Sequence, residues 1–543
     1  MRHPTTGLPA LNQDLLLHLA HFLSHNCLIA LSSTCSTLRH YYRTLIFSSC
    51  HWDDDSPPPQ SAWPLIRHLY IDDDRISSIG TSALFQNLDG LTSLHVRGDR
   101  LTDAAVHILA SANNLTTLDF SYLCYRSNAD WTPLPAFPAL RCKPRMLQFC
   151  SRHDFPNAVR LMTYSINKAL ATRRAFATLL HQVDVSQIER LEVGMQSLSL
   201  PFAAAYTWTS LHTLVVTGIS IHPADAAGED ERASDLRAHE HVHFGTLLTA
   251  APRLRVLRIH CRSSPRATSP HYVAWPANEL PPPSGNAISH LEELTIYNPA
   301  PDEGLLYQLP LSLRALSLVT YPHAHYDTLP MSFPILSETR ALGGMRTADE
   351  LLGILGRRPL PDLRQLRLSF RLHTSMALLK RIAALFPLLE VLEVHAECGP
   401  GCLWTPDELA DLAHALAPLA HLRVLRLDTF NDVLDDAAPA AAAAPVIACM
   451  PEPEPDEDGE AFAAAQLRAI RYHPWMRGLP AAEIARALAP LSRVSEVWLP
   501  KMERSGLRSY RRAWQIYRIE RQEGAARLCA EDGPTIEMVN GEY

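Results

Sequence analysis

The residues best suited to metal binding are three histidines within residues 239–243, which read His-Glu-His-Val-His. Imidazoles at i, i+2 and i+4 lie on one side of an extended segment and can share a metal ion. No HExxH pattern is present, the surrounding segment is polar, and the chain holds 26 histidines. A solvated loop is therefore the favoured interpretation, and no metal site is predicted.

Cys398 and Cys402 enclose three residues, and no matching second pair follows them. Zinc sites built on cysteine usually need two such pairs, so this stretch is interpreted as a turn. The sequence also lacks a glycine-rich phosphate loop, a GxSxG elbow and a paired-carboxylate motif. No catalytic residue, cofactor or cofactor-binding residue is predicted, and the protein is expected not to be an enzyme.

Basic and aromatic side chains interleave in residues 501–521, where arginines alternate with Tyr510, Trp514 and Tyr517. A helix of this composition could bind phosphate groups or nucleic acid. Alternatively, it could close the last unit of a repeat array with its aromatic side while its arginines face water. The second interpretation is favoured, so residues 501–543 are predicted to form a C-terminal cap helix and tail, with no nucleic-acid partner.

The chain has 543 residues, 47% hydrophobic and 20% charged, a composition typical of folded globular proteins. Its net charge is 49 − 57 = −8 with histidine neutral, which excludes nucleic-acid binding by bulk positive charge. Eleven cysteines without a paired CxxC indicate reduced thiols in a cytoplasmic or nuclear protein. No signal peptide or bilayer-spanning segment is recognisable, so no membrane contact is expected.

The elements that must position any binding residues follow a recurring pattern, apolar-x-x-apolar-x-apolar. Its last three positions alternate, as a short strand with one buried side requires. Several start-to-start spacings fall between 22 residues (Leu291 to Leu313) and 27 residues (Leu467 to Val494), within the period of leucine-rich repeats. The pattern starts at Ile66, Leu91, Leu115, Ile188, Leu211, Leu254, Leu291, Leu313, Leu363, Leu389, Leu422, Leu467 and Val494.

Helices are predicted between several of these strands. Residues 405–408 form a capping box with proline at the first helical position, and the apolar stripe that follows ends at Pro418. This succession predicts an α/β fold, an irregular leucine-rich-repeat solenoid over residues 65–500 with a parallel sheet on its concave face. The gap between Leu115 and Ile188 should contain at least one irregular unit. Insertions are expected near residues 222–243, 263–287 and 432–462.

Residues 1–50 are predicted to form a small helical module, followed by a linker at 51–64. Apolar residues recur at helical spacing over 15–23, and two further short helices are predicted before residue 47. Three short helices in about 40 residues cannot bury their apolar faces alone, so the module is expected to contact a partner. Three aspartates and three prolines in residues 53–59 predict an exposed, semi-rigid spacer.

The N-terminal pattern resembles an F-box. The resemblance rests on Leu11-Asn-Gln-Asp-Leu-Leu16, Leu19, Phe22-Leu23, Leu28-Ile-Ala-Leu31, Thr34-Cys35 and Leu38-Arg39. It is nearest to the F-box-like module of large fungal families, although Asn12 replaces a common proline and Leu38 a common tryptophan. The resemblance implies a three-helix domain that docks on the Skp-type adaptor of a cullin–RING ubiquitin ligase. The implied adaptor-binding or module-core residues are Leu11, Leu15, Leu16, Leu19, Leu23, Leu28 and Leu31.

In each repeat, the side chain between the last two apolar positions should point onto the concave face. These positions are Tyr70, His95, Asp119, Glu192, Val215, Arg258, Thr295, Ser317, Arg367, Glu393, Arg426, Arg471 and Trp498. Arginine predominates from residue 258 onward, and its planar fork binds carboxylate and phosphate through two oxygens. Arg426 and Arg471, if they are neighbours about 4.8 Å apart, could hold one anionic group together. Exposed strand positions also favour long solvated side chains, so both interpretations stay open. The predicted target-binding residues are Arg258, Arg367, Arg426 and Arg471, for an acidic or phosphorylated protein target.

The leading functional hypothesis is therefore an F-box-like protein with C-terminal leucine-rich repeats, the substrate-recognition subunit of an SCF-type ubiquitin ligase. Its partners would be a Skp-type adaptor, a cullin and a protein target. It would act by proximity, holding a target near a ubiquitin-charged enzyme. The alternative is a leucine-rich-repeat scaffold without a ubiquitin-ligase role, in which the N-terminal helices are only a cap. A hydrolase that uses the histidine-rich insertion has the least support.

Overall fold

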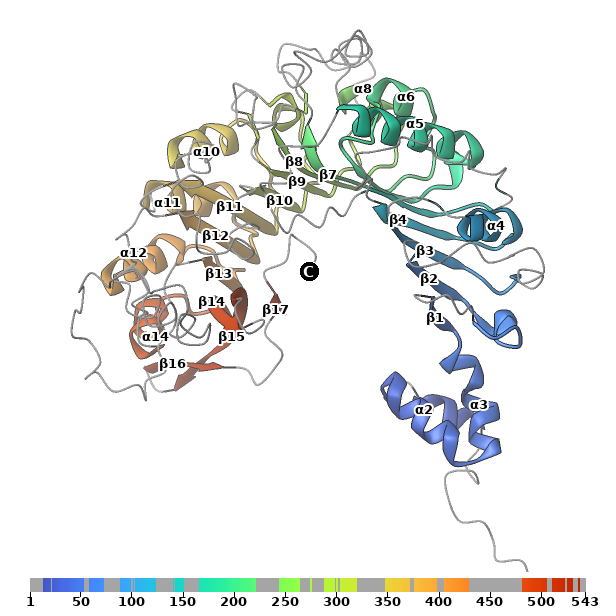
Figure 1. Ribbon diagram of the computed structural model, residues 1–543. Helices are drawn as coiled ribbons and strands as arrows, with labels where there is room; N and C mark the ends of the chain where they lie inside the picture. Colours follow the sequence, from blue (N-terminus) through green and yellow to red (C-terminus); the bar gives the residue numbers. More distant parts are fainter. Residues whose placement is uncertain are drawn as a thin grey trace, which may run out of the picture.

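In the computed structural model, the strands line the inner side of an arch and most helices lie on its outer side (Figure 1). The structure describes residues 13–20, 22–52, 58–72, 88–98, 101, 103–123, 140, 142–150, 166–220, 244–263, 274–275, 288–297, 299–300, 303–319, 347–371, 376–397, 405–428, 481–504, 510–522, 525–530 and 536–537. Within these ranges no helix is both long and apolar enough to cross a lipid bilayer.

The described strands join into one 17-stranded sheet. Its parallel part consists of β1 (Ser49–Trp52), β2 (His68–Asp72), β3 (Ser93–Gly98), β4 (Thr117–Leu123), β5 (Met146–Phe149), β6 (Arg190–Gly194), β7 (Thr213–Ser220), β8 (Val256–Ser263), β9 (Glu293–Tyr297), β10 (Ala315–Val319), β11 (Gln365–Arg371), β12 (Val391–Glu397), β13 (Val424–Asp428) and β14 (Glu496–Arg504). Each strand from β1 to β13 pairs in parallel with the next along the chain. Sequential parallel pairing of this kind is the arrangement of a repeat solenoid.

The strands share one register because the same apolar positions of every repeat face the core. Leu366 of β11 lies beside Leu392 of β12, which lies beside Leu425 of β13, and all three side chains are buried. Alternate residues of a strand point to opposite sides of the sheet, so the residues between these leucines face the concave side. A single hydrophobic core runs from Trp52 to Leu528.

Helices connect several of the strands and cover the outer side of the core (Figure 1). They are α4 (Asp103–Ser111), α5 (Ile166–Gln182), α6 (Leu200–Ala204), α8 (Phe244–Ala250), α10 (Ala348–Leu355), α11 (Met376–Leu385), α12 (Pro406–Leu416) and α14 (Ala481–Leu488), with short 3-10 turns η2 (Trp63–Leu65), η4 (Val185–Gln187) and η6 (Gly304–Tyr307). The predicted capping box is present at α12, where the Thr405 side chain accepts from the Glu408 N–H and Glu408 accepts from Thr405. The buried stripe of α12 includes Leu409, Leu412 and Leu416.

Three helices precede the first strand: α1 (Gln13–Ala20), α2 (His25–Thr34) and α3 (Ser36–Ile46). Ser24 caps α2 by accepting from the Cys27 N–H, as expected for serine at a helix start. The helices pack around a small core of their own, centred on Leu16, Leu38 and Tyr42 and separate from the solenoid core. Arg43 of α3 donates to the Ser61 carbonyl at 2.7 Å, which ties these helices to the solenoid.

The irregular unit expected between Leu115 and Ile188 is present as β5. Two other predicted boundaries are wrong. The predicted linker 51–64 begins inside β1, and Trp52 and Trp63 are buried edge to face in the solenoid core. The charged and proline residues at 53–57, which lie outside the described part of the chain, predict a spacer. Burial of the flanking indoles of Trp52 and Trp63 instead fixes the three N-terminal helices to the first repeat.

The segment predicted as an insertion at 263–287 also contributes to the core through Trp275, which packs against Gly245. Backbone N–H groups of Ala274 and Trp275 donate to the buried Glu303 carboxylate at 2.7 and 2.9 Å. These charge-assisted bonds hold the indole in place. The predicted insertions 222–243 and 432–462 lie outside the described residues.

The predicted C-terminal cap helix is wrong. Residues 510–522 form β15 (Tyr510–Gln522), followed by β16 (Ala525–Ala530) and β17 (Ile536–Glu537), all paired antiparallel. Gln515, Tyr517 and Ile519 turn toward the core at every second residue, which is the period of a strand. Antiparallel pairing with β14 also satisfies backbone groups that a helix would have left open at the last parallel strand.

Candidate interaction surfaces

One row of side chains runs along the middle of the concave face, and strand register makes it continuous. This concave row is His51, Tyr70, His95, Asp119, Gln148, Glu192, Val215, Arg258, Thr295, Ser317, Arg367, Glu393, Arg426 and Trp498. The sequence pattern predicted twelve of these positions in order. It missed His51 and Gln148, although the alternation of Leu147 and Phe149 around Gln148 carries the signal.

The sequence left open whether Arg426 and Arg471 are neighbours, and the sheet register gives Arg426 other neighbours. The neighbours of Arg426 in the sheet are Glu393 on β12 and Trp498 on β14, so both flanks of β13 are occupied. Arg471 itself lies outside the described residues. β13 and β14 pair directly with each other, so no strand stands between them.

Aromatic rings stack along the first three strands of the concave row. The ring of Tyr70 lies between those of His51 and His95, with centroids 4.4 and 4.3 Å away and planes within 7° and 12° of parallel. The stack ends on Asp119, whose Oδ2 is 2.9 Å from His95 Nδ1. Burial would raise the pKa of Asp119, but hydrogen bonds from His95 and Ser121 outweigh burial and lower it.

A second acidic group follows two strands later. Gln148 Nε2 donates to Glu192 Oε2 at 2.8 Å, and Arg190 is 3.3 Å from the same oxygen. Glu192 is buried, and amide and guanidinium donors compensate for its burial. The N-terminal half of the concave face therefore presents ring edges and carboxylates that are held by neutral or cationic donors.

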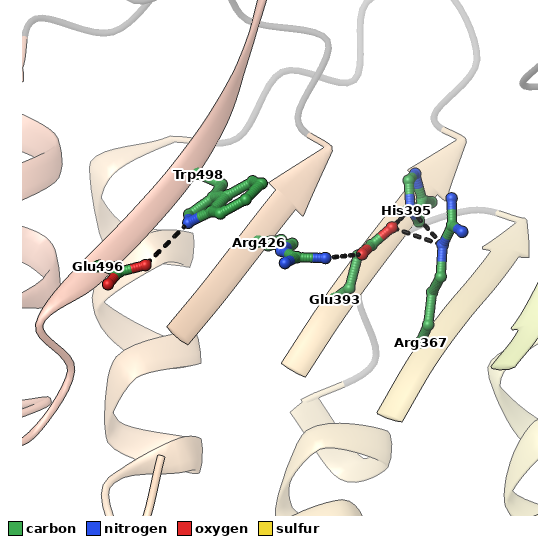
Figure 2. Close-up of polar contacts among 6 residues, drawn as sticks. All are labelled: Arg367, Glu393, His395, Arg426, Glu496 and Trp498. Carbon is green, nitrogen blue, oxygen red and sulfur yellow. Dashed lines mark hydrogen bonds and ion pairs between the residues drawn. The ribbon is translucent and has the colours of Figure 1, made fainter. Parts of the chain in front are cut away.

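Glu393 is the centre of the C-terminal half of the concave row (Figure 2). Its Oε1 lies 2.5 Å from Arg367 Nε and 2.5 Å from His395 Nε2, and its Oε2 lies 3.1 Å from Arg426 Nη1. The Glu393 side chain is only 3% exposed. Burial would raise the pKa of Glu393, but the charge of Arg367 and the bond with His395 hold the pKa far below its ordinary value.

Trp498 closes this cluster on the β14 side. The Arg426 guanidinium lies 4.0 Å from the centroid of its ring, a cation–π contact, and the indole N–H donates to Glu496 at 3.3 Å (Figure 2). Arg367, Glu393, Arg426 and Trp498 therefore form a ladder across four strands in which each member contacts the next.

The predicted target-binding arginines that the structure describes all contact carboxylates of the sheet. Arg258 Nε lies 2.7 Å from Glu293 Oε1, while Arg367 and Arg426 share Glu393. Arg258 and Arg367 stand on β8 and β11, three strand spacings apart. The structure therefore brings two of the predicted residues together around Glu393 and keeps Arg258 apart from that pair.

The seven leucines implied as adaptor-binding residues fall into different environments. Leu16 and Leu28 are buried in the core of the three helices, and Leu23 and Leu31 pack against it. Leu15 and Leu19 are 53% and 39% exposed, and Phe22 after α1 is 74% exposed. Leu11 lies outside the described residues. Leu15 and Leu19 are four residues apart and lie on one side of α1, and the Phe22 ring beyond the helix contacts the ring of His18 edge to face. Leu15, Leu19 and Phe22 are here named the apolar α1 face.

No group of three metal-binding side chains occurs within the described ranges. Residues 239–243, as well as Cys398 and Cys402, lie outside those ranges.

Comparison with known proteins gives little guidance. No protein-family model matches the chain, and no curated protein matches it. Among solved structures, the chain is similar to one titled "Crystal structure of Rad7 and Elc1 complex in yeast", with 13% sequence identity and coverage of 70% of this chain and 87% of that chain. The TM-score of that superposition is 0.29. The fold assignment therefore rests on the strand pairing of this chain itself.

Proposed function

We propose that this protein is the substrate-recognition subunit of an SCF-type ubiquitin ligase. In this proposal the apolar α1 face binds a Skp-type adaptor, and the concave face of the solenoid binds a protein target. The chain performs no bond chemistry. It shortens the distance between a target lysine and a ubiquitin-charged enzyme that the partners supply, which raises their effective concentration.

The observation that carries the proposal is the exposure of the apolar α1 face. The three helices possess their own core, formed by Leu16, Leu28 and their neighbours, yet Leu15, Leu19 and Phe22 remain outside it. Apolar side chains left outside a completed core are typical of a surface that a partner covers. The resemblance of the same residues to an F-box supports an adaptor as that partner.

Two exposed leucines of the solenoid provide a matched control. Leu311 and Leu388 are 51% and 36% exposed, close to the values of Leu15 and Leu19. They lie in the turns before β10 and β12, far along the chain from the three helices. Changing both Leu311 and Leu388 to aspartate adds the same charge, at comparably exposed positions, as changing Leu15 and Leu19.

The first prediction concerns adaptor binding. Leu15→Asp with Leu19→Asp should weaken binding to a purified Skp-type adaptor by more than about a hundredfold, since each carboxylate would enter a desolvated apolar contact. The Leu311→Asp, Leu388→Asp chain should bind like the wild type. Titration calorimetry measures the affinities, and circular dichroism checks that both variants fold. Equal adaptor binding by both variants would contradict the F-box assignment.

The alternative function is a leucine-rich-repeat scaffold without a ligase role. The two differ in what happens to captured targets. With the proteasome blocked, the wild-type chain should recover ubiquitin-modified targets, whereas the Leu15→Asp, Leu19→Asp chain should recover the same targets unmodified. A scaffold would give the same unmodified targets with both chains.

A further inference from the structure

The exposed large apolar side chains of the described solenoid residues all lie near β10 and β12. Tyr307 is 46% exposed, comparable with Leu311 and Leu388. Tyr307 ends η6, Leu311 lies in the turn before β10, and Leu388 lies in the turn before β12. No other large apolar side chain in the described part of the solenoid is exposed to this extent. Exposed apolar side chains that gather in one place are typical of a surface that binds another protein.

Leu311 and Leu388 stand in equivalent turns, which the strand register brings to one edge of the solenoid. Each turn closes with a backbone N–H to carbonyl bond across three residues, at 3.2 Å before β10 and 3.1 Å before β12. The turn before β11 closes in the same way and exposes Pro361. Because β10, β11 and β12 share one register, the two leucines precede strands about 10 Å apart, two spacings of about 4.8 Å. An extended segment of about four residues spans that distance.

A cation–π contact orders the tyrosine at this edge. The Arg357 guanidinium, just after α10, lies 4.2 Å from the centroid of the Tyr307 ring, and both side chains are exposed. Tyrosine and arginine are enriched among the residues that contribute most to protein–protein binding. Because each of these side chains already restrains the other, a partner that covers them removes less conformational freedom.

The same edge is cationic, although the whole chain has a net charge of −8. Residues 304–314, 355–364 and 386–390 contain four arginines and two carboxylates. The register places Arg314 beside Arg364, and Arg364 contacts Glu390 on its other side. Arg314 is exposed, and its side chain forms no ion pair within the described ranges. A carboxylate from a partner would therefore complement a cation that has only another cation beside it.

We propose that Tyr307, Leu311, Arg314 and Leu388, here named the edge patch, dock a segment of a partner protein that places a carboxylate beside apolar side chains. The apolar side chains of that segment cover Tyr307 and the two leucines, and its carboxylate forms an ion pair with Arg314. A basic segment would meet like charge, and an uncharged one would leave Arg314 without an anion. The inference goes beyond the proposed function, because the edge patch belongs neither to the apolar α1 face nor to the concave row.

The test begins with a displayed library of short random peptides and the full chain. Peptides that bind the wild type are kept, and those that also bind the Leu311→Asp, Leu388→Asp chain are removed. The remaining peptides should carry aspartate or glutamate next to leucine, isoleucine or phenylalanine. The edge patch is refuted if no peptide remains, or if the remaining peptides are not enriched in carboxylates over the starting library.

A remaining peptide is then titrated against substituted chains by calorimetry. Leu311→Ser with Leu388→Ser removes apolar area without adding charge and should weaken binding more than about tenfold. Arg314→Ala should weaken binding about twofold to fivefold, as expected for one exposed ion pair, and the difference should shrink as salt rises. Arg145→Ala is the matched control, because Arg145 is exposed and holds the same repeat position before β5. Equal losses for the two arginine substitutions would indicate a general charge effect and contradict the edge patch.

The outcome is separable from that of the proposed function. The Leu311→Ser, Leu388→Ser chain should bind the Skp-type adaptor like the wild type, and circular dichroism checks that it folds. The Leu15→Asp, Leu19→Asp chain should bind the selected peptide like the wild type. Loss of peptide binding in that second chain would assign the peptide to the apolar α1 face and overturn the edge patch.

Discussion

The two ends of the concave row use the same backbone for opposite chemistry. At the N-terminal end, His51, Tyr70 and His95 stack as rings across three neighbouring strands. At the C-terminal end, Arg367, Glu393 and Arg426 alternate in charge. Parallel strands about 4.8 Å apart bring either kind of neighbour into contact. The side chains, and not the fold, decide which interaction forms.

The two ends also differ in how far water reaches them. The His95 and Asp119 side chains are 24% and 12% exposed, whereas that of Glu393 is 3% exposed. When a contact in the partly exposed stack is lost, water can take its place. A buried carboxylate between two guanidinium groups cannot, so loss of one partner leaves uncompensated charge. The C-terminal end should therefore be far more sensitive to single substitutions.

The largest effect is expected for Glu393→Ala. Removal of this carboxylate leaves Arg367 and Arg426 near each other without an anion, which should lower the free energy of unfolding by about 3–5 kcal/mol. Urea unfolding followed by circular dichroism measures the change. Removal of the exposed Glu390, which contacts Arg364 and Arg423, is the matched control and should lower it by under about 1 kcal/mol. Equal effects of the two substitutions would mean that burial does not determine how much these ion pairs contribute to the free energy of unfolding.

Glu393 should also make stability depend on pH. Its pKa in the folded chain lies below its value in the unfolded chain, which is about 4.3. Its stabilising contribution is therefore complete above about pH 4.3 and is lost as pH falls toward the folded-state pKa. Glu393→Gln should flatten the acid side of the stability profile. An unchanged acid limb in this variant would contradict the direction of the shift.

A smaller effect is expected at the end of the charged ladder. Trp498→Leu removes the ring beneath Arg426 and part of a nearly buried side chain, which should lower the free energy of unfolding by about 2 kcal/mol. Trp498→Phe keeps a ring face but loses the indole bond to Glu496 and part of the buried ring, so it should lose about half as much. A larger loss for phenylalanine than for leucine would show that the cation–π contact contributes nothing.

The sequence pattern was sufficient to predict where the concave row runs, because each repeat fixes its register by three alternating apolar positions. It could not predict which row members contact each other, since side-chain contacts between strands depend on tertiary pairing. Arg471 illustrates this limit: its repeat matches the pattern, but β13 pairs directly with β14. The C-terminal strands were misread as a helix because interleaved arginines and aromatic residues fit both periods.

Two buried residues on the concave side, His260 of β8 and Ser369 of β11, show a second limit. His260 and Ser369 follow the last apolar position of their repeats by one residue, where the consensus pattern assigns no role. Both side chains are buried, and among the described residues His260 Nε2 and Ser369 Oγ have no hydrogen-bond partner. Neither property is visible in the sequence. The repeat pattern therefore predicts which residues face the concave side more readily than it predicts which of their atoms are buried or hydrogen-bonded.

The smallest effect is expected at the N-terminal stack. Tyr70→Leu removes both ring contacts of Tyr70 and should lower the free energy of unfolding by about 1 kcal/mol, because aromatic pairs contribute about 0.5–1.5 kcal/mol and this stack is partly wet. Tyr70→Phe keeps the ring between His51 and His95 and should leave the free energy of unfolding unchanged within about 0.5 kcal/mol. Both are measured by urea unfolding beside Glu393→Ala. If Tyr70→Leu destabilises the chain as strongly as Glu393→Ala, then solvent exposure does not determine how much each end of the concave row contributes to stability. The aromatic stack would then contribute as much as the buried ion pairs of Glu393.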